Sequence, residues 1–396
     1  MDRQRTYNIR RALWFAKGMI PSLIGLFLPR HRKRIIFNST RNEYYNFNSR
    51  YLFEYFVRNY PEYEIRYVMN DPEKRQQLNQ QFGPGKHYFI ETESLKGMWY
   101  ALQASVWVTS AFETPVGGLF LRFRRFVYLL GHGTHFKAIV FNERRLPKSK
   151  WIYYQMMRLN FSAYLVTSRA LLETYRRAYR CRTEQLAIMG EPRHDRIFAP
   201  DLSVMHRHFG EAVSQERNVL YAPTWRPDGA VRLFPFEDTD WDALAVFLEQ
   251  NRINIFLRLH PSFQEDITEY TRRSSRIKIL DNTTVEEISE VMGFFDLLIT
   301  DYSSIFISFL LLDRPVMFLP YDLEQYDEKM GFIRPYDELT PGPKPDTFAG
   351  FLADLSRLLD DRTYYRRERE EMRRFFNDFS RENCKMNAEY LLERIS

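Results

Sequence analysis

Four polar clusters in this sequence each follow a short apolar run of the kind that forms a buried strand. They are Gly131-His-Gly-Thr-His-Phe-Lys137, Ala222-Pro-Thr-Trp-Arg226, His260-Pro261 and Asp301-Tyr-Ser-Ser304. In open parallel sheets, ligands bind beyond the carboxyl ends of the strands. The clusters therefore predict ligand sites at sheet edges, and their basic and hydroxyl groups suit an anionic ligand such as a phosphate ester.

His132 stands between two glycines, Gly131 and Gly133, which let the backbone approach a substrate closely. We predict that His132 is a general base that takes the proton of an attacking hydroxyl group. Thr134 is expected to support this loop, and Lys137 is expected to add positive charge. The alternative is a tight turn that carries an exposed histidine.

The Asp301 cluster lies between a predicted strand and a predicted helix, and the first turn of that helix carries two hydroxyl groups. The free N–H groups and the positive dipole end of a helix attract anions. We therefore assign Asp301, Ser303 and Ser304 to a site that binds phosphate. The alternative is ordinary helix capping by the same serines.

The two remaining clusters add further predicted phosphate contacts in the same half of the chain. His260 follows a strand that ends at Arg258-Leu259, and a histidine there can donate a hydrogen bond to phosphate. Arg226 offers a rigid guanidinium fork, and Thr224 and Arg258 complete the predicted phosphate-binding set. A structural role is the usual explanation for a lone histidine, but the serine-bearing helix nearby favours a phosphate contact for His260.

Other polar residues are expected to be structural. Arg193 and Asp195 are predicted to form a buried ion pair that shapes the site. Asp238 and Asp240 resemble a metal-binding pair, but they precede a predicted helix and are interpreted as caps. The sequence has no P-loop, GxGxxG, HExxH or CxxC motif, so we expect neither a metal nor another cofactor.

Strand-like runs alternate with helical stretches along most of the chain, a pattern typical of parallel βαβ units. One series runs from residue 34 to residue 167, and a second starts at residue 218 after a helix-rich linker. The pattern predicts an α/β fold of two Rossmann-like halves with a boundary near residue 205. The predicted domains are 34–205, 206–360, and a charged helical tail, 361–396.

Charge is concentrated at one end of the 396-residue chain. The net charge is +6, but the first 34 residues carry nine Lys and Arg against one acidic residue, so the remainder is slightly acidic. This distribution argues against a nucleic-acid footprint over the whole molecule. The two cysteines, Cys181 and Cys384, cannot form a disulfide framework and fit reducing surroundings.

Segment 1–33 combines these basic residues with an apolar run. The uncharged part, Gly18 to Leu28, is shorter than the roughly 20 residues that span a bilayer. Because basic residues flank it on both sides, we predict that the segment lies in an anionic membrane interface. The alternative is an amphipathic helix that docks on the protein itself.

The clusters together resemble the CDP-glycerol glycerophosphotransferase family of teichoic acid and capsule polymer synthesis. The residues that carry the resemblance, in order over roughly residues 100–335, are His132-Gly-Thr134, Gly190-Glu-Pro-Arg-His-Asp195, Tyr221-Ala-Pro-Thr-Trp-Arg226, Arg258-Leu-His-Pro261 and Thr300-Asp-Tyr-Ser-Ser304. The later Arg314-Pro315 and Tyr321-Asp-Leu323 also fit. The resemblance implies a GT-B-like fold, in which two Rossmann-like domains face a cleft. It implies that domain 34–205 lies on the acceptor side and that domain 206–360 binds the nucleotide donor, with Thr224, Arg226, Arg258, Asp301, Ser303 and Ser304 as the donor-binding residues. It also implies that His132 is the base, that His260 contacts the donor phosphate, and that Ser303 and Ser304 hold the pyrophosphate.

The implied reaction transfers glycerol phosphate from CDP-glycerol, or the polyol phosphate of CDP-ribitol, to a hydroxyl of a lipid-linked acceptor, with release of CMP. The implied location is the cytoplasmic face of the membrane, and the length resembles that of the shorter, primase-like members. Where the family often has Trp-His-Gly-Thr-Pro, this chain has Gly131-His-Gly-Thr-His135, which alters the acceptor side. Two alternatives stay open, a GT-B glycosyltransferase that uses CMP-sialic acid or another nucleotide sugar and a non-catalytic protein that binds membrane surfaces.

Overall fold

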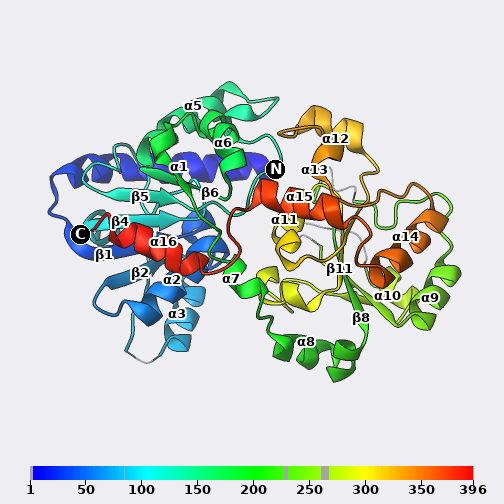
Figure 1. The fold of residues 1–396 in the computed structure, drawn as a ribbon. Coiled ribbons are helices and arrows are strands. Elements are labelled where there is room, and N and C mark those ends of the chain that lie inside the picture. Colours follow the sequence, from blue (N-terminus) through cyan, green and yellow to red (C-terminus); the bar gives the residue numbers. More distant parts are fainter. Residues whose placement is uncertain (1–2, 84, 227–230, 260–266, 396) are drawn as a thin grey trace. The chain divides into compact units, whose positions relative to one another are not determined.

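The computed structural model describes residues 3–83, 85–226, 231–259 and 267–395 (Figure 1). The chain forms two compact units. The first consists of Met1–Gly133, Ile139–Arg193 and Asp378–Ser396, and the second of Thr134–Ala138 and His194–Asn377. The predicted boundary near residue 205 differs from the observed one, because the linker helices α7 (His194–Ile197) and α8 (Leu202–Phe209) belong to the second unit.

A seven-stranded parallel sheet forms the centre of the first unit. Its strand order is β3-β2-β1-β4-β5-β6-β7, so the direction of winding reverses between β1 and β4. The strands are β1 (His31–Asn38), β2 (Glu64–Val68), β3 (Phe89–Ile90), β4 (Ala104–Thr109), β5 (Phe126–Leu129), β6 (Ala163–Val166) and β7 (Leu186–Ile188). The helices are α1 (Arg3–Ile24), α2 (Phe47–Asn59), α3 (Pro72–Gln81), α4 (Leu95–Leu102), α5 (Lys148–Met157), α6 (Leu172–Tyr179) and α16 (Asn383–Leu392).

The core beneath α2 is built largely from aromatic side chains. Phe53 of α2 packs edge-on against Phe37 of β1 and Tyr67 of β2, with ring centroids 5.7 Å and 5.4 Å apart. The C-terminal helix α16 packs against α2 (Figure 1), and Tyr128 Oη of β5 donates a hydrogen bond of 2.8 Å to Asn387 Oδ1. The predicted tail is therefore not one element, since α15 (Arg366–Phe376) lies in the second unit and α16 completes the first.

The second unit repeats the same winding on a five-stranded parallel sheet. Its order is β10-β9-β8-β11-β12, so the winding reverses between β8 and β11. The strands are β8 (Arg217–Ala222), β9 (Ile253–Leu257), β10 (Ile277–Ile279), β11 (Leu297–Thr300) and β12 (Val316–Phe318). The remaining helices are α9 (Trp241–Gln250), α10 (Thr268–Arg273), α11 (Ile305–Phe309), α12 (Leu323–Lys329), α13 (Tyr336–Leu339) and α14 (Phe348–Asp360).

The predicted fold class, an α/β fold of two Rossmann-like parallel sheets, is confirmed. Every strand predicted from an apolar run is present. The sequence did not reveal β3 and β7, which are two and three residues long. Strands of two or three residues are too short to show a recognisable hydrophobic pattern. They are identified only by their pairing with the adjacent strands of the sheet.

The N-terminal segment forms helix α1, which docks on the first unit through small residues. A Cβ atom added to Gly18 would lie 2.2 Å from the carbonyl oxygen of Gly117, so the two backbones are in close contact. Ser22 Oγ accepts a hydrogen bond from the Leu119 amide at 3.3 Å, and Arg11 pairs with Glu113 at 3.0 Å. No helix among the described residues is both long and apolar enough to cross a membrane.

Candidate active site

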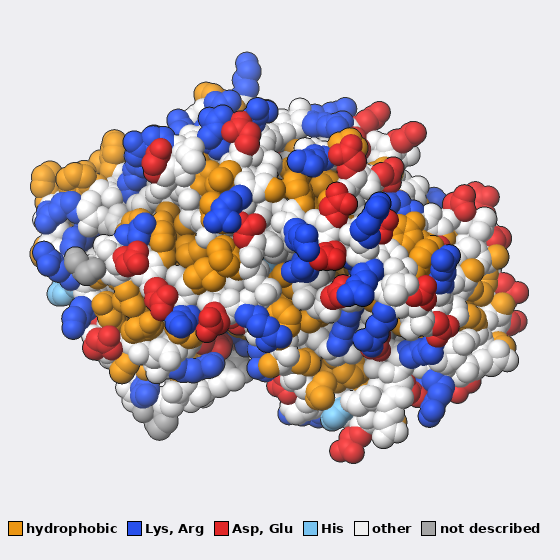
Figure 2. Space-filling view, viewed as in Figure 1, with side chains coloured by type: hydrophobic (Ala, Val, Ile, Leu, Met, Phe, Trp, Pro, Cys, Tyr) orange, Lys and Arg blue, Asp and Glu red, His pale blue; other side chains and the backbone are white. Residues whose placement is uncertain are grey.

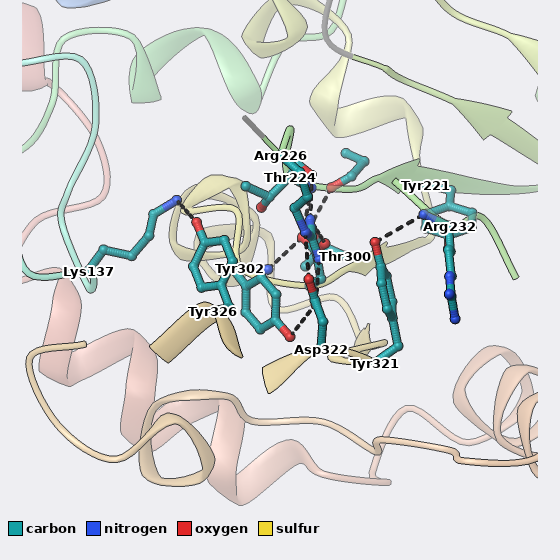
Figure 3. Close-up of polar contacts among 12 residues, drawn as sticks. Lys137, Tyr221, Thr224, Arg226, Arg232, Thr300, Tyr302, Tyr321, Asp322 and Tyr326 are labelled. Atoms are coloured by element: carbon teal, nitrogen blue, oxygen red, sulfur yellow. Dashed lines mark hydrogen bonds and ion pairs between the residues drawn. The ribbon is translucent and has the colours of Figure 1, made fainter. Parts of the chain in front are cut away.

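The second sheet carries a buried ionic cluster at the point where its winding reverses (Figure 3). Arg226, which follows β8, lies between two carboxylates. Its Nη1 is 2.7 Å from Asp301 Oδ2, and its Nη2 is 2.8 Å from Asp322 Oδ1. Arg226 and Asp301 are almost fully buried, with 3% and 2% of their surfaces exposed. The chain thus satisfies a buried charge with charges of opposite sign, as burial requires.

Asp301 joins the ends of β8 and β11. One carboxylate oxygen accepts the backbone N–H of Thr224 at 2.7 Å and the N–H of Tyr302, while the other bonds to Arg226. Its carbonyl oxygen accepts a hydrogen bond from Tyr336 Oη at 2.7 Å. The structure therefore gives Asp301 a positioning role between the two strands that flank the predicted phosphate site.

Arg226, which the sequence suggested as a phosphate contact, is already paired within the protein. Beyond the two carboxylates, it donates to the carbonyl of Thr224, and the rings of Tyr302 and Tyr321 lie 5.0 Å from its guanidinium. Burial alone would lower the pKa of Arg226, but its bonds to Asp322 and Asp301 raise it above the ordinary value. The guanidinium stays charged and holds the loops in place.

Three hydroxyl groups of the predicted phosphate site, those of Thr224, Ser303 and Ser304, have few or no hydrogen-bond partners within the part of the protein that the structure describes. Among the described residues, Thr224 Oγ1 is buried and has no hydrogen-bond partner. Ser303 and Ser304 are partly exposed in the turn between β11 and α11, and Ser304 makes no side-chain capping bond. Ser303 Oγ accepts the Ile305 amide at the long distance of 3.4 Å, so capping explains only part of this serine pair.

Lys137 belongs to the second unit although it follows the loop of the first. The segment Thr134–Ala138 is bound there by backbone hydrogen bonds of 2.9 Å from Ala138 to Gly331 and from Ile333 to Phe136. Lys137 Nζ reaches Tyr326 Oη at 3.3 Å (Figure 3). Desolvation lowers the pKa of this half-buried lysine to about 8, against the opposing effect of Asp301.

Arg258 has a structural role in the described residues. Its Nη1 donates to the carbonyl oxygens of Asp281 and Val285 at 2.6 Å and 2.7 Å, and its Nη2 donates to that of Glu286 at 3.2 Å. This guanidinium ties the end of β9 to the loop after β10, and its predicted contact with the donor stays a prediction. His260, the second predicted catalytic residue, lies outside the described residues.

In the first unit, His132 follows β5 in a loop with glycine-specific geometry. Gly131 and Gly133 have φ angles of 69° and 144°, values that residues with a Cβ rarely adopt. The His132 side chain reaches solvent, and the Phe47 ring lies 5.5 Å from it. Desolvation, with the positive charge of Arg193, lowers the pKa of His132 below 6.5. The imidazole is therefore neutral at pH 7, as a general base must be.

Arg193 is paired within the first unit, but with a residue that the sequence did not indicate. Its Nε lies 2.7 Å from Glu191 Oε2, and Asn48 Nδ2 donates to the same oxygen at 3.2 Å. Asn48 Nδ2 also donates to the carbonyl of Gly131 at 3.0 Å, which connects this pair to the His132 loop. Asp195 lies in α7 of the second unit, and its pairing with Arg193 stays a prediction.

The interpretation of the Asp238-Thr-Asp240 pair as caps is confirmed. Asp240 Oδ1 accepts the Ala243 amide at 2.9 Å at the beginning of α9, and Asp238 Oδ1 accepts the Phe348 amide at 2.9 Å at the beginning of α14. Both carboxylates therefore serve helix ends.

Comparison with protein families places these features in context. Residues 22–396 match the model of the CDP-Glycerol:Poly(glycerophosphate) glycerophosphotransferase family. This chain belongs to that family.

Curated relatives of this glycerophosphotransferase include three teichoic acid poly(glycerol phosphate) polymerases. That of Bacillus spizizenii is 29% identical over 81% of this chain and 82% of its own length. Those of Staphylococcus epidermidis and Bacillus subtilis are 28% and 27% identical, and the chain spans only 46% and 42% of their lengths. A teichoic acid ribitol-phosphate primase of Bacillus spizizenii is 27% identical over half of the chain.

Solved structures support the fold of this family member. The wall teichoic acid polymerase TagF superimposes with a TM-score of 0.76 over 99% of this chain and 95% of that chain, at 24% identity. A UDP-GlcNAc 2-epimerase from Neisseria meningitidis gives 0.57 over 91% of this chain at 9% identity. The architecture is therefore shared well beyond the limit of sequence similarity.

Several contacts of this site escaped sequence reasoning. Asp322 lies in the family-like stretch Tyr321-Asp-Leu323, but the sequence did not indicate that it completes the pairing of Arg226. Tyr302 Oη donates to Asp322 Oδ1 at 2.9 Å, and its ring stacks on Tyr326 with centroids 4.0 Å apart. Tyr302 belongs to the Asp301 cluster of the sequence, but no role for the tyrosine side chains could be predicted, because aromatic residues are frequent throughout this chain.

Proposed function

We propose that this chain transfers glycerol phosphate from CDP-glycerol to a hydroxyl of a lipid-linked saccharide or polyol-phosphate acceptor, with release of CMP. The single observation that carries the donor half is the polar set at the β8–β11 reversal, with unpaired Thr224 Oγ1 beside partly exposed Ser303 and Ser304. Family membership and the poly(glycerol phosphate) polymerases among the relatives support the choice of donor.

The proposed chemistry is an in-line displacement at phosphorus. The acceptor hydroxyl attacks the β-phosphorus of CDP-glycerol, the bond from that phosphorus to the CMP oxygen breaks, and the hydroxyl proton passes to His132. Such transfers depend mainly on positioning and on neutralising charge. Only Gly133 separates His132 from the segment Thr134–Ala138, which supplies Lys137 to the donor unit.

The reaction class is tested by CMP release from CDP-glycerol, CDP-ribitol and CMP-sialic acid, each with a lipid-linked saccharide acceptor. We expect release from a CDP-polyol, with CDP-glycerol preferred over CDP-ribitol. Release from CMP-sialic acid alone would replace the proposal by a glycosyltransferase. If none of these donors binds in calorimetry, the proposal is contradicted and the alternative of a non-catalytic binding protein is favoured.

The Thr224 hydroxyl provides a prediction that separates ligand binding from folding. Thr224→Val removes a buried hydroxyl that lacks a partner, so we expect the free energy of unfolding to stay equal or rise slightly. If the hydroxyl bonds to the donor, CDP-glycerol should bind about tenfold more weakly. Calorimetry and thermal unfolding of the same preparation check both effects, and unchanged donor affinity would remove Thr224 from the site.

Lys137 provides a prediction with a defined pH dependence. Its pKa of about 8 in the folded chain lies below the ordinary 10.5, so the charged lysine reduces stability below pH 8, and this effect fades as the pH rises toward 10.5. We expect Lys137→Met to raise the free energy of unfolding at pH 7 by about 1 kcal/mol and to weaken donor binding. The wild-type protein should itself lose donor affinity as the pH rises past about 8. A variant that is less stable and binds normally would contradict the charge role.

We propose further that the enzyme works at the cytoplasmic face of an anionic membrane, held there by α1. The outward side of α1 and the turn after it expose an apolar row, in which Phe27, Ile20 and Leu13 are 86%, 70% and 65% exposed. Phe120 and Phe123 are also exposed, and Arg30 Nη2 donates to the carbonyl of Phe123 at 3.3 Å. Hydrophobic and basic side chains are interleaved along this region (Figure 2), the combination that binds anionic lipid surfaces.

Vesicle sedimentation tests this attachment. The double variant Ile20→Asp with Phe27→Asp should lose most binding to phosphatidylglycerol vesicles and keep its thermal midpoint, because both side chains point away from the core. Val246→Asp is the matched control, since Val246 lies on α9 of the second unit and is 54% exposed. Full sedimentation of the double variant would show that α1 docks only on the protein.

A further inference from the structure

A second basic feature lies in the first unit, and none of the residues that line it is assigned to the site described above. A cavity of about 510 Å³ opens beside the end of α6 and the short 3-10 helix η3 (Val140–Asn142). Three of its six lining residues are arginines, and the lining consists of Phe141, Asn142, Arg176, Arg177, Arg180 and Cys181.

Local structure accounts for two of these arginines. Arg176 and Arg177 both bond to the single carboxylate of Glu173, with Arg176 Nε at 2.7 Å and Arg177 Nε at 2.5 Å. Basic residues in a last helical turn also offset the negative end of the helix dipole. One carboxylate nevertheless leaves one of these two positive charges uncompensated.

Arg180 is the residue that local structure does not account for. Its guanidinium lies over the ring of Phe141, 4.4 Å from the centroid, and 5.9 Å from that of Trp151. Among the described residues, no carboxylate or carbonyl accepts a hydrogen bond from this guanidinium. The aromatic rings restrict its orientation and leave its N–H groups available, which is a preorganised fork for an oxyanion.

The surroundings do not oppose an anion. Desolvation raises the pKa of Cys181 to about 11, so the thiol in the cavity wall is neutral. Residues 141–184 contain ten Lys and Arg against three acidic residues. Basic side chains predominate over the part of the surface where α5 and α6 lie (Figures 1 and 2).

We propose that this cavity binds a phosphodiester group, with Arg180 as the principal contact and Arg176 and Arg177 as supporting charges. The volume exceeds that of one phosphate and accommodates an attached polyol. Two sources share this chemistry, a unit of a polyol-phosphate acceptor chain and the headgroup of an anionic lipid. The acceptor source rests on the proposed function, whereas phosphodiester binding itself does not.

The test measures binding of glycerophosphoglycerol, a soluble phosphodiester, to the full chain by calorimetry. Arg180→Gln is compared with Arg182→Gln, a neighbouring exposed arginine that does not line the cavity, so both variants lose one charge. We expect the wild type and Arg182→Gln to bind alike and Arg180→Gln to bind about tenfold more weakly. Equal losses in both variants, or no loss in either, would overturn the proposal.

Cys181 locates the bound probe, because the other cysteine, Cys384, is buried. Glycerophosphoglycerol should slow alkylation of Cys181 in the wild type and not in Arg180→Gln, and an unchanged rate in the wild type would overturn the assignment to this cavity. Phosphatidylglycerol vesicles then identify the source. Weaker vesicle binding by Arg180→Gln than by Arg182→Gln indicates the lipid headgroup, and equal vesicle binding indicates the acceptor chain.

CDP-glycerol affinity, measured on the same preparations, separates this proposal from the proposed function. A wild-type protein that binds glycerophosphoglycerol through Arg180 and does not bind CDP-glycerol would keep the cavity site and remove the donor assignment. If both variants bind CDP-glycerol equally and diester binding does not depend on Arg180, the donor assignment stays and the cavity site is removed.

Discussion

Replacing His132 by alanine is expected to lower turnover by about 10²- to 10⁴-fold, the usual contribution of a general base, with CDP-glycerol affinity nearly unchanged. The structure supports the prediction through the lowered pKa of His132 and its accessible position between Gly131 and Gly133. The measurement is single-turnover CMP release alongside donor calorimetry. Loss of donor binding would instead make His132 a binding residue.

Two controls sharpen the test of His132. His135→Ala removes a nearby imidazole on the same stretch of chain and should keep most of the turnover. Because a base must be unprotonated, wild-type kcat/KM should fall as the pH drops below the pKa of His132, which is below 6.5. This acid limb should be absent from the residual activity of His132→Ala, and its persistence would assign the titration to another group.

Arg226→Met is expected to have the largest effect on stability. It leaves the buried carboxylate of Asp301 and the carboxylate of Asp322 without their cation. Removing one partner of a buried ion pair costs about 3–5 kcal/mol, and this loss should appear in urea unfolding of the second unit. A change below about 1 kcal/mol, combined with lost donor binding, would instead restore Arg226 as a phosphate contact.

Asp322→Asn is the matched variant. Asp301 still pairs with Arg226 in it, and an asparagine oxygen can still accept from Tyr302 Oη and Arg226, so we expect a loss of only about 1 kcal/mol. Burial alone would raise the pKa of Asp322, but its bond to Arg226 lowers that pKa below 3.8. The stability from Asp322 is therefore complete above pH 3.8 and is lost as the pH falls through the lowered value. Arg226→Met should abolish this dependence.

The sequence by itself determined the sheets, the places of the polar clusters and the family. Strands such as Ile253–Leu257 are short, largely apolar runs. Because such a pattern depends only on residues that are adjacent in the sequence, the strands could be predicted without the structure. The Asp301 and Thr224 clusters follow their strands immediately, so the reversal of winding between β8 and β11 brings both to one edge. The ordered clusters also carried the resemblance that the family match confirms.

Only the tertiary structure decided what each charged side chain contacts. Arg226 and Arg258 both follow strands and look equally suited to phosphate, yet one bonds to Asp322, 96 residues away, and the other to backbone carbonyls. Lys137 follows the His132 loop in sequence but belongs to the other unit. The reason is that a buried charge needs a partner within hydrogen-bond distance. Which residue becomes that partner depends on the strand order and on the connections between strands. Short sequence patterns contain no information about either.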